Sequence, residues 1–275
     1  MARADDYPGE HYQRLVDNHQ QMAHEQLAFG FHVHVGLSDR EAAVQVMNRI
    51  RLWFAPMVAL SANSPFWSGA DTGYASYRSQ IWGRLALSGP MTPFGLRAEY
   101  DALVGALIPA GVLTDDSSIY WDVRLNDQLG TVELKVMDAC SRVDEAVMLA
   151  GLARALVRTC HERAEREEPY PIVRPEFLHA ANRRASRHGL DTELLDIEAS
   201  RKIPAREMIE NLLAFARPAL EEGGDWEEVS FLARDTIERG NGASRQRGVY
   251  GRAGRLEAVV DMLIEETAQG TDEAS

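Results

Sequence analysis

Three short segments alternate apolar and polar residues, and this alternation constrains the fold more than any other feature of the sequence. The first is Gly30–Gly36, which reads Gly-Phe-His-Val-His-Val-Gly, and the others are Ile119–Leu125 and Thr131–Met137. A period of two places successive side chains on opposite faces of a β-strand. Asn126–Gly130, between the second and third segments, has the composition of a hairpin turn. The sequence therefore predicts three strands, each with one apolar and one polar face.

The polar faces of these predicted strands carry a mixture of ionisable and hydrogen-bonding groups. They are His32 and His34 on the first strand, Tyr120, Asp122 and Arg124 on the second, and Glu133 and Lys135 on the third. In a single sheet they would line one surface, where imidazole and carboxylate can hold a divalent ion and Arg and Lys an anion. There are two alternatives to such a binding surface. One is the solvated polar face common in antiparallel sheets, and the other is a metal-dependent hydrolase that uses His32 and His34.

Helical periodicity dominates the rest of the chain. Before the second strand we expect helices over residues 10–27, 39–62 and 97–108, with Ser38 as the N-cap of the second, and a helical turn at 77–82 within the loop-rich stretch 61–95. After it, helices are predicted over residues 142–167, 175–188, 205–221, 225–239, 243–252 and 255–268. Strands early and helices late favour an α+β fold. We expect a single domain over residues 1–268 and a disordered tail over 269–275.

The charge balance and the absence of several motifs exclude some classes of protein. Lys and Arg number 29 against 42 Asp and Glu, and the net charge of −13 argues against a general binder of nucleic acid or anionic membranes. A polar N-terminus without a secretory signal and the lack of a long apolar run predict a cytoplasmic protein. Cys140 and Cys160 form no disulfide framework or metal motif. P-loop, dinucleotide-binding and nucleophile-elbow motifs are missing.

Two further groups of basic residues are candidate anion sites. Arg78 and Arg84 flank Trp82 in the loop-rich stretch, and the run Ser244-Arg245-Gln246-Arg247 follows Asn241-Gly242. The alternative for the first group is a pair of solvated loop arginines, and for the second a solvated helix face.

Several motifs resemble those of the glutamate–cysteine ligase type 2 family, the bacterial carboxylate–amine ligases. The matching segments are Gly30–Gly36, Leu60–Trp67, Thr72–Arg78, Tyr120–Arg124, Thr131–Asp138 and Gly242–Arg247. They occur in the family's order between about Tyr12 and Ala268, which is nearly the whole chain.

The resemblance implies a glutamine-synthetase-like catalytic fold with a curved antiparallel sheet and a helical C-terminal half. It implies an ATP-dependent ligase that phosphorylates a carboxylate, such as the γ-carboxylate of glutamate, and then joins the acyl phosphate to an amine. ATP and Mg²⁺, or Mn²⁺, would be the cofactors, and the partners would be small molecules and not nucleic acid or membrane. His32 and Glu133 match metal ligands, and Arg124, Lys135 and Arg78 are the catalytic candidates. Contacts to substrate or ATP would come from His34, Tyr120, Asp122, Arg84 and Arg245.

One departure from the family pattern affects this interpretation. Family members usually begin with a further segment that contains a G-x-E-x-E strand with two acidic metal ligands, and this sequence has no such strand. We therefore expect an incomplete sheet with an open edge, which another chain or a loop would cover. The alternative to an active ligase is an inactive or split fragment that needs another chain for the metal-binding strands. A homo-oligomer is also compatible with an open edge.

Overall fold

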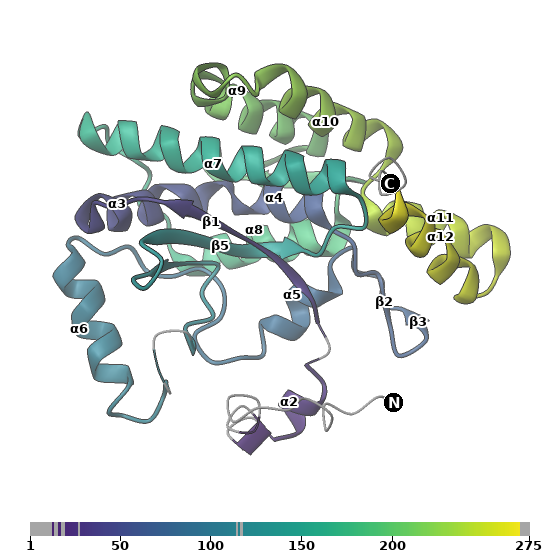
Figure 1. Ribbon diagram of the computed structural model, residues 1–275, viewed down its shortest axis with the longest axis horizontal. Helices are drawn as coiled ribbons and strands as arrows, with labels where there is room; N and C mark the ends of the chain where they lie inside the picture. The colour runs from purple at the N-terminus through teal and green to yellow at the C-terminus, as the bar shows by residue number, and fades with distance from the viewer. Residues whose placement is uncertain are drawn as a thin grey trace, which may run out of the picture.

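The computed structural model describes residues 13, 16–17, 20–26, 28–113, 115 and 118–269. Within them the chain forms a three-stranded antiparallel sheet and a set of helices, most of which lie on one side of it (Figure 1). The predicted α+β class is confirmed.

The three alternating segments form one sheet, as predicted. β1 (Gly30–Gly36), β5 (Thr131–Asp138) and β4 (Val123–Asn126) lie in the order β1-β5-β4, so the long β5 is the central strand. His34 and Arg124 both pair with Glu133, one from each neighbouring strand. This register places the predicted polar residues on a common face.

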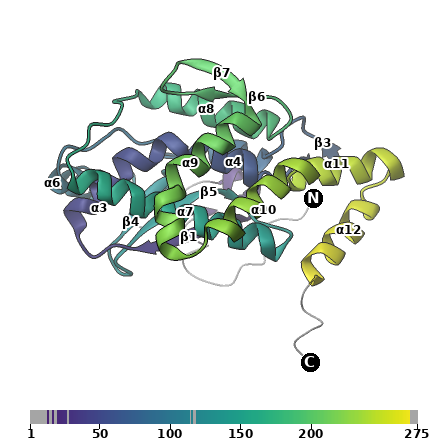
Figure 2. The same ribbon diagram turned by 90° about the horizontal axis from the view of Figure 1, so that it is seen from above.

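The helices pack against the opposite, apolar face of the sheet. Val132 and Leu134 of β5 and Val123 of β4 are buried in the main hydrophobic core, together with residues of α3, α4 and α7. In Figure 1, α7, α9 and α10 are stacked on this side, whereas α2, α5 and α6 lie on the other; Figure 2 shows α11 and α12 extending beyond one end. The bounds of the described helices are α2 (Gln21–His24), α3 (Arg40–Ile50), α4 (Phe54–Ser61), α5 (Tyr77–Trp82), α6 (Arg97–Leu107), α7 (Val143–Glu165), α8 (Pro175–His188), α9 (Ala205–Gly223), α10 (Trp226–Arg239), α11 (Gly242–Ala253) and α12 (Glu257–Ala268).

The structure differs from the predictions at several boundaries. The predicted helix 39–62 is divided into α3 and α4 by a 3-10 turn, Arg51–Trp53, and Asp39 rather than Ser38 caps it by accepting the backbone N–H groups of Glu41 and Ala42. The second strand begins only at Val123. Within the predicted helix 10–27 the structure describes residues 13, 16–17 and 20–26, where α2 spans Gln21–His24, and the rest of that range lies outside the described residues, as does the predicted tail apart from Gln269.

Two small hairpins were not predicted. They are formed by β2 (Phe66–Trp67) with β3 (Ala70–Asp71) and by β6 (Glu193–Asp196) with β7 (Arg201–Pro204). Their strands are only two and four residues long, too short for alternation to identify them.

A β-bulge interrupts the pairing of β1 with β5. Phe31 pairs with Met137 and Val33 with Leu134, so two residues of β5, Lys135 and Val136, oppose the single residue His32. The guanidinium of Arg78 donates to the backbone carbonyl of Lys135 at 2.9 Å and to that of Val136 at 3.3 Å. The two carbonyl groups of the bulge thus accept hydrogen bonds from a buried side chain of α5.

Gly30 provides the space that this arginine occupies. A Cβ atom at Gly30 would lie 2.3 Å from Arg78 Nη2 and 2.7 Å from Nε, which is closer than non-bonded atoms approach. At the other end of the same strand, a Cβ at Gly36 would have nothing within 4 Å. Glycine is therefore required by packing at the first position and not at the second.

We predict that Gly30→Ala lowers the free energy of unfolding by about 1–3 kcal/mol, the usual cost of overpacking. The reason is that the Arg78 guanidinium, although at the end of a flexible side chain, is buried and holds two carbonyls, so it cannot move aside freely. Gly36→Ala is the matched control and should change the stability little. Urea denaturation of the three proteins checks this, and equal stabilities for Gly30→Ala and wild type would contradict it.

Candidate functional site

The polar face of the sheet is centred on the Glu133 carboxylate. Its Oε1 lies 3.1 Å from His32 Nδ1 and 3.6 Å from His34 Nε2, both on β1. Its Oε2 accepts a hydrogen bond of 2.5 Å from Arg124 Nε on β4. The structure therefore brings four of the predicted site residues into direct contact around Glu133.

Glu133 is held in its charged form. Burial by itself would raise the pKa of this carboxyl group, but the hydrogen bond with His32 and the positive charges of Arg124 and Lys135 hold it at about 2. A carboxylate with only 3% of its side chain exposed and with cationic neighbours remains ionised at neutral pH.

Lys135 lies next to Glu133 on the same face, in an aromatic environment. Its Nζ lies 5.6 Å from the ring centroid of Trp82 and 5.4 Å from that of Tyr120, and it donates to the backbone carbonyl of Ile119 at 3.1 Å. Burial and the neighbouring charge of Arg124 lower the pKa of Lys135 to about 8, although Glu133 opposes this. Burial also raises the pKa of the Tyr120 phenol. The ammonium is thus a weakly solvated positive charge beside Glu133.

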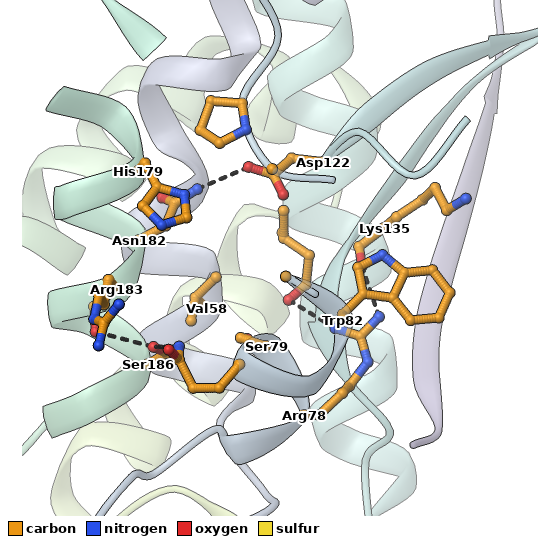
Figure 3. Close-up of a pocket in the computed structure, with 15 residues that line it drawn as sticks. Val58, Arg78, Ser79, Trp82, Asp122, Lys135, His179, Asn182, Arg183 and Ser186 are labelled. Carbon is orange, nitrogen blue, oxygen red and sulfur yellow. Dashed lines mark hydrogen bonds between the residues drawn. The ribbon is translucent and has the colours of Figure 1, made fainter. Parts of the chain in front are cut away.

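A cavity of about 150 Å³ adjoins this face and extends to α8 (Figure 3). Arg78, Trp82, Asp122 and Lys135 contribute to its wall, so these residues, although distant in sequence, lie around one space. One oxygen of Asp122, Oδ2, accepts a hydrogen bond of 2.9 Å from Asn182 Nδ2 on α8. Burial raises the pKa of Asp122 to about 7, and the charge of Arg78 and the Asn182 hydrogen bond only partly offset that effect.

The contribution of α8 to this cavity was not predicted from the sequence. His179, Asn182, Arg183 and Ser186 all line it. Their spacing of i, i+3, i+4 and i+7 places them on one side of a helix, and it could have been read as a polar stripe on the predicted helix 175–188. What the spacing alone did not indicate is that the stripe faces Asp122.

The two arginines that flank Trp82 do not come together. The Arg78 guanidinium is 4% exposed and is engaged by the bulge carbonyls, with its centre 5.4 Å from the Trp82 ring centroid. Arg84 Nη1 instead forms an ion pair of 2.7 Å with Glu25, and Arg84 is not among the residues that line the cavity. The structure thus places these two candidate residues in separate surroundings.

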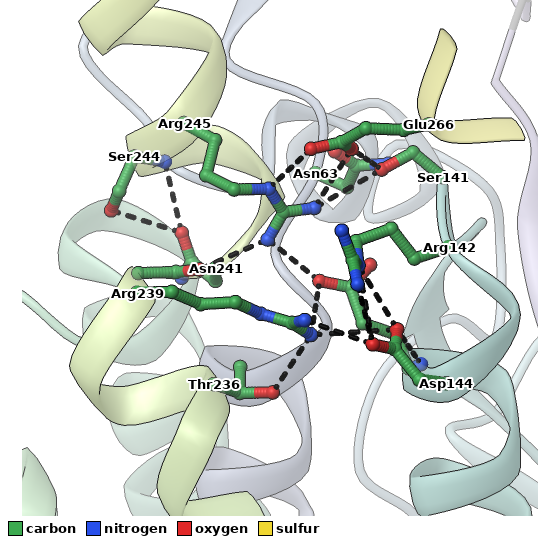
Figure 4. Close-up of polar contacts among 12 residues, drawn as sticks. Asn63, Ser141, Arg142, Asp144, Thr236, Arg239, Asn241, Ser244, Arg245 and Glu266 are labelled. Carbon is green, nitrogen blue, oxygen red and sulfur yellow. Dashed lines mark hydrogen bonds and ion pairs between the residues drawn. The ribbon is translucent and has the colours of Figure 1, made fainter. Parts of the chain in front are cut away.

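Arg245 lies in a buried ion-pair cluster away from the sheet face (Figure 4). Its Nε is 2.7 Å from Glu266 Oε1 and its Nη1 is 2.7 Å from Glu145 Oε1, while Ser141 donates to Glu266 Oε2. The side chains of Arg245, Glu145 and Glu266 are 13%, 6% and 9% exposed, so little water competes for these contacts. The cluster joins α11 and α12 to the start of α7, and no described contact links Arg245 to Glu133 or Lys135.

The residues on either side of Arg245 each hold a different part of the chain. Ser244 donates to Asp191, and Gln246 donates to the backbone carbonyl and the side-chain oxygen of Asn63. Arg247 forms a bidentate pair with Asp71 at 2.7 and 2.9 Å. The predicted basic patch is therefore a set of contacts that fixes the loop 63–78, from which Arg78 reaches the bulge.

The polar face alone does not offer a complete magnesium site. Mg²⁺ prefers several oxygen ligands in octahedral geometry, whereas both oxygens of Glu133 already contact His32 and Arg124, and Asp122, the other carboxylate predicted for this face, accepts a hydrogen bond from Asn182. Over the described residues, no group of three or more His, Cys, Asp or Glu side chains has a metal-binding arrangement. Along the same part of the chain, no helix has the length and hydropathy needed to cross a bilayer.

Comparison with known proteins identifies a family. Residues 1–262 match the model of glutamate–cysteine ligase family 2. A Frankia alni protein with the provisional name glutamate–cysteine ligase 2-2 is 46% identical over 94% of this chain and 68% of its own length. A Rhodopirellula baltica protein with the provisional name glutamate–cysteine ligase 2 is 39% identical over 94% of this chain and 69% of its own length. A further relative, from Frankia casuarinae, is 43% identical, but this chain covers only 30% of it.

A solved structure shares the fold. The crystal structure of a glutamate–cysteine ligase from Francisella tularensis in complex with AMP superimposes with a TM-score of 0.57 at 12% sequence identity. The match covers 94% of this chain and 61% of that one. It confirms the fold that the resemblance implied.

We predict that Arg245→Leu lowers the free energy of unfolding by about 3–5 kcal/mol, because it leaves the buried Glu145 and Glu266 carboxylates without their shared partner. Arg252→Leu, at an exposed position of the same helix, is the matched control and should have little effect. Urea denaturation measures both. A loss of less than about 1 kcal/mol for Arg245→Leu would show that the cluster is not needed for stability.

We also predict that Glu133→Gln changes how stability depends on pH. A carboxyl group whose pKa is lowered on folding stabilises the protein above its unfolded pKa of about 4.3, and this contribution disappears as the pH falls toward 2. The difference in unfolding free energy between wild type and Glu133→Gln should therefore narrow as the pH falls from about 5 to 3. A constant difference over this range would contradict the assignment of Glu133 as a carboxylate stabilised by His32 and Arg124.

Proposed function

The chain belongs to glutamate–cysteine ligase family 2, and we propose that it forms a γ-glutamyl amide bond in an ATP-dependent reaction. The observation that carries the proposal is the convergence of Arg124 and Lys135 on Glu133, next to a cavity that both Lys135 and Asp122 line. The complex of the fold relative with AMP supports an adenine nucleotide as one substrate.

The proposed reaction has two steps. In the first, an oxygen of the glutamate γ-carboxylate attacks the γ-phosphorus of ATP, the bond to the bridging oxygen breaks, and ADP leaves. In the second, an amine attacks the carbonyl carbon of the acyl phosphate, the C–N bond forms, and inorganic phosphate leaves with the electrons of the C–O bond. Both steps develop negative charge on oxygens of the transferred group, and fixed cations in a weakly solvated site stabilise that charge.

Lys135 and Arg124 are the residues that we assign to this stabilisation. Lys135 is 4% exposed and Arg124 9% exposed, so their charges are little screened by water. The contact of Arg124 with Glu133 and the contacts of Lys135 with Trp82, Tyr120 and Ile119 fix both side chains before substrate binds. We propose that these two cations hold the phosphoryl oxygens, while Glu133 keeps them apart and correctly oriented.

A divalent ion is part of the chemistry of this kind of reaction, because it neutralises phosphate charge. His32 and Glu133 could supply two ligands, but the described face lacks the further oxygen ligands that Mg²⁺ prefers. Neither the phosphorylation step nor the attack of the amine is assigned to a metal ion. This shortage of carboxylates is also the observation that favours a second candidate, in which the polypeptide becomes active only when another chain completes the acidic ligand set.

The test is ADP release from the purified protein with ATP, Mg²⁺, glutamate and hydroxylamine, a small amine that traps acyl phosphates. Wild type should release ADP in a glutamate-dependent reaction and form the hydroxamate. The second candidate predicts release only after a polypeptide with the family's acidic strand is added. Absence of release in both cases would contradict the ligase proposal.

We predict that Lys135→Met lowers kcat by roughly 100- to 1,000-fold, the usual loss when one group that stabilises a developing oxyanion is removed. The sequence has only one other lysine, Lys202, which is exposed on β7, so Lys202→Met is the matched control and should retain wild-type activity. Glu133→Gln should also remove activity while circular dichroism shows an intact fold. Activity near the wild-type level in Lys135→Met would exclude Lys135 from the site.

A further inference from the structure

We propose that Asp122 is the base that removes a proton from the acceptor amine, and that the cavity between Asp122 and α8 is where this amine binds as an ammonium ion. The inference rests on the proposed ligase function and deepens it. It assigns a catalytic role to Asp122, which is not one of the two cations proposed to stabilise phosphate charge and is not among the residues in contact with Glu133.

Asp122 lies at the right place relative to the phosphate-binding cations. The backbone N–H of Lys135 donates to the Asp122 carbonyl at 2.9 Å, so the two residues are cross-strand partners. Arg124, which contacts Glu133, is two residues further along the same chain segment, a distance of about 7 Å in extended backbone. An amine next to Asp122 would therefore lie beside the carbonyl group that is activated near Lys135.

One oxygen of Asp122 is available to a ligand. Oδ2 accepts the hydrogen bond from Asn182, which fixes the carboxyl group in the cavity wall. Oδ1 has no hydrogen bond to any described residue, and Figure 3 shows the second oxygen directed into the cavity. Asp122 is also the one acidic residue among the described residues that line this cavity, so an ammonium group has a single anionic partner there.

The surroundings of Asp122 suit an exchange of protons. The charged or titratable groups that share the cavity wall are Arg78 of α5, Lys135 of β5, and His179 and Arg183 of α8. Burial raises the pKa of Asp122 to about 7 in spite of the Arg78 charge. A base with a pKa near the working pH is ionised often enough to accept a proton and basic enough to take it.

In the proposed step, Asp122 and the departing phosphate each take one proton from the amine nitrogen. The ammonium R–NH₃⁺ gives one proton to the Asp122 carboxylate, which becomes a neutral carboxylic acid, and the lone pair of R–NH₂ attacks the acyl phosphate carbon. The tetrahedral adduct then expels phosphate with the electrons of the C–O bond. The second nitrogen proton goes to the departing phosphate, and Asp122 returns its proton to solvent.

The experiment compares two kinds of acceptor. An alkyl amine such as L-2-aminobutyrate or ethylamine is protonated at neutral pH and needs a base, whereas hydroxylamine is largely uncharged and does not. We expect Asp122→Asn to lower kcat with the best alkyl amine of the panel by about 100-fold or more, and to leave kcat with hydroxylamine within about threefold of wild type. Asp101→Asn, at an exposed ion pair on α6, is the matched control for loss of a carboxylate.

The pH dependence provides a second readout. With the alkyl amine, wild-type kcat should fall as the pH drops below about 7, because protonated Asp122 cannot accept a proton. This acidic limb should be missing in Asp122→Asn and present, at lower overall rate, in Asp122→Glu. A structural role for Asp122 would lower the rates with both acceptors together and leave the shape of the profile unchanged.

The outcomes distinguish the proposed role of Asp122 from the proposed ligase function. Three results would overturn the role of Asp122 while the ligase function stands. The first is an equal loss of kcat with both acceptors in Asp122→Asn, and the second is no loss with either. The third is wild-type turnover with hydroxylamine but with none of the alkyl amines. Absence of wild-type turnover with hydroxylamine, both alone and with the added acidic-strand polypeptide, would instead count against the ligase function itself. If Asp122→Asn fails to fold by circular dichroism, Asp122→Glu must restore both the fold and the acidic limb, and its failure to restore the limb would overturn the inference.

Discussion

The geometry of the site depends on one buried cation, Arg78, whose guanidinium donates hydrogen bonds to the backbone. Its guanidinium holds the two carbonyl groups that the β5 bulge withdraws from the sheet, and Gly30 leaves the room for it. Next to this bulge, His32 contacts Glu133, and the Lys135 ammonium lies near the rings of Trp82 and Tyr120. Arg78, which the resemblance implies as a catalytic candidate, thus also holds the backbone beside the cavity that it lines.

Much of the fold and part of the site could be predicted from the sequence, because period-two alternation is a local signal. The two histidines of β1, Glu133 and Arg124 do meet on one face of one sheet, as alternation requires. The bulge could not be predicted, since an extra residue in one strand is visible only once its partner strand is known. The role of α8 was missed for the same reason: its polar stripe has a clear helical period, but nothing local indicates that Asn182 faces Asp122.

Arg245 shows why charge in a motif is a poor guide to its location. The run Ser-Arg-Gln-Arg looks like an anion site in sequence, yet Arg245 is enclosed by Glu145 and Glu266, which lie 100 residues before it and 21 after it. Opposite charges at such separations leave no trace in a local pattern. The net charge of −13 is equally uninformative about the site, where Arg124 and Lys135 lie around the Glu133 carboxylate.

Four successive side chains near the start of α11 contact separate parts of the chain: Ser244 contacts Asp191, Arg245 contacts α7 and α12, and Gln246 and Arg247 contact Asn63 and Asp71 of the loop 63–78. Successive helical residues are rotated by about 100°, so all four contacts depend on one helical phase. Adding or deleting a single residue between Asn241 and Ser244 would change that phase and break all four sets of contacts at once, whereas a substitution of one contact residue breaks one set. The number of residues between Asn241, the N-cap of α11, and Ser244 is therefore fixed by all of these contacts together.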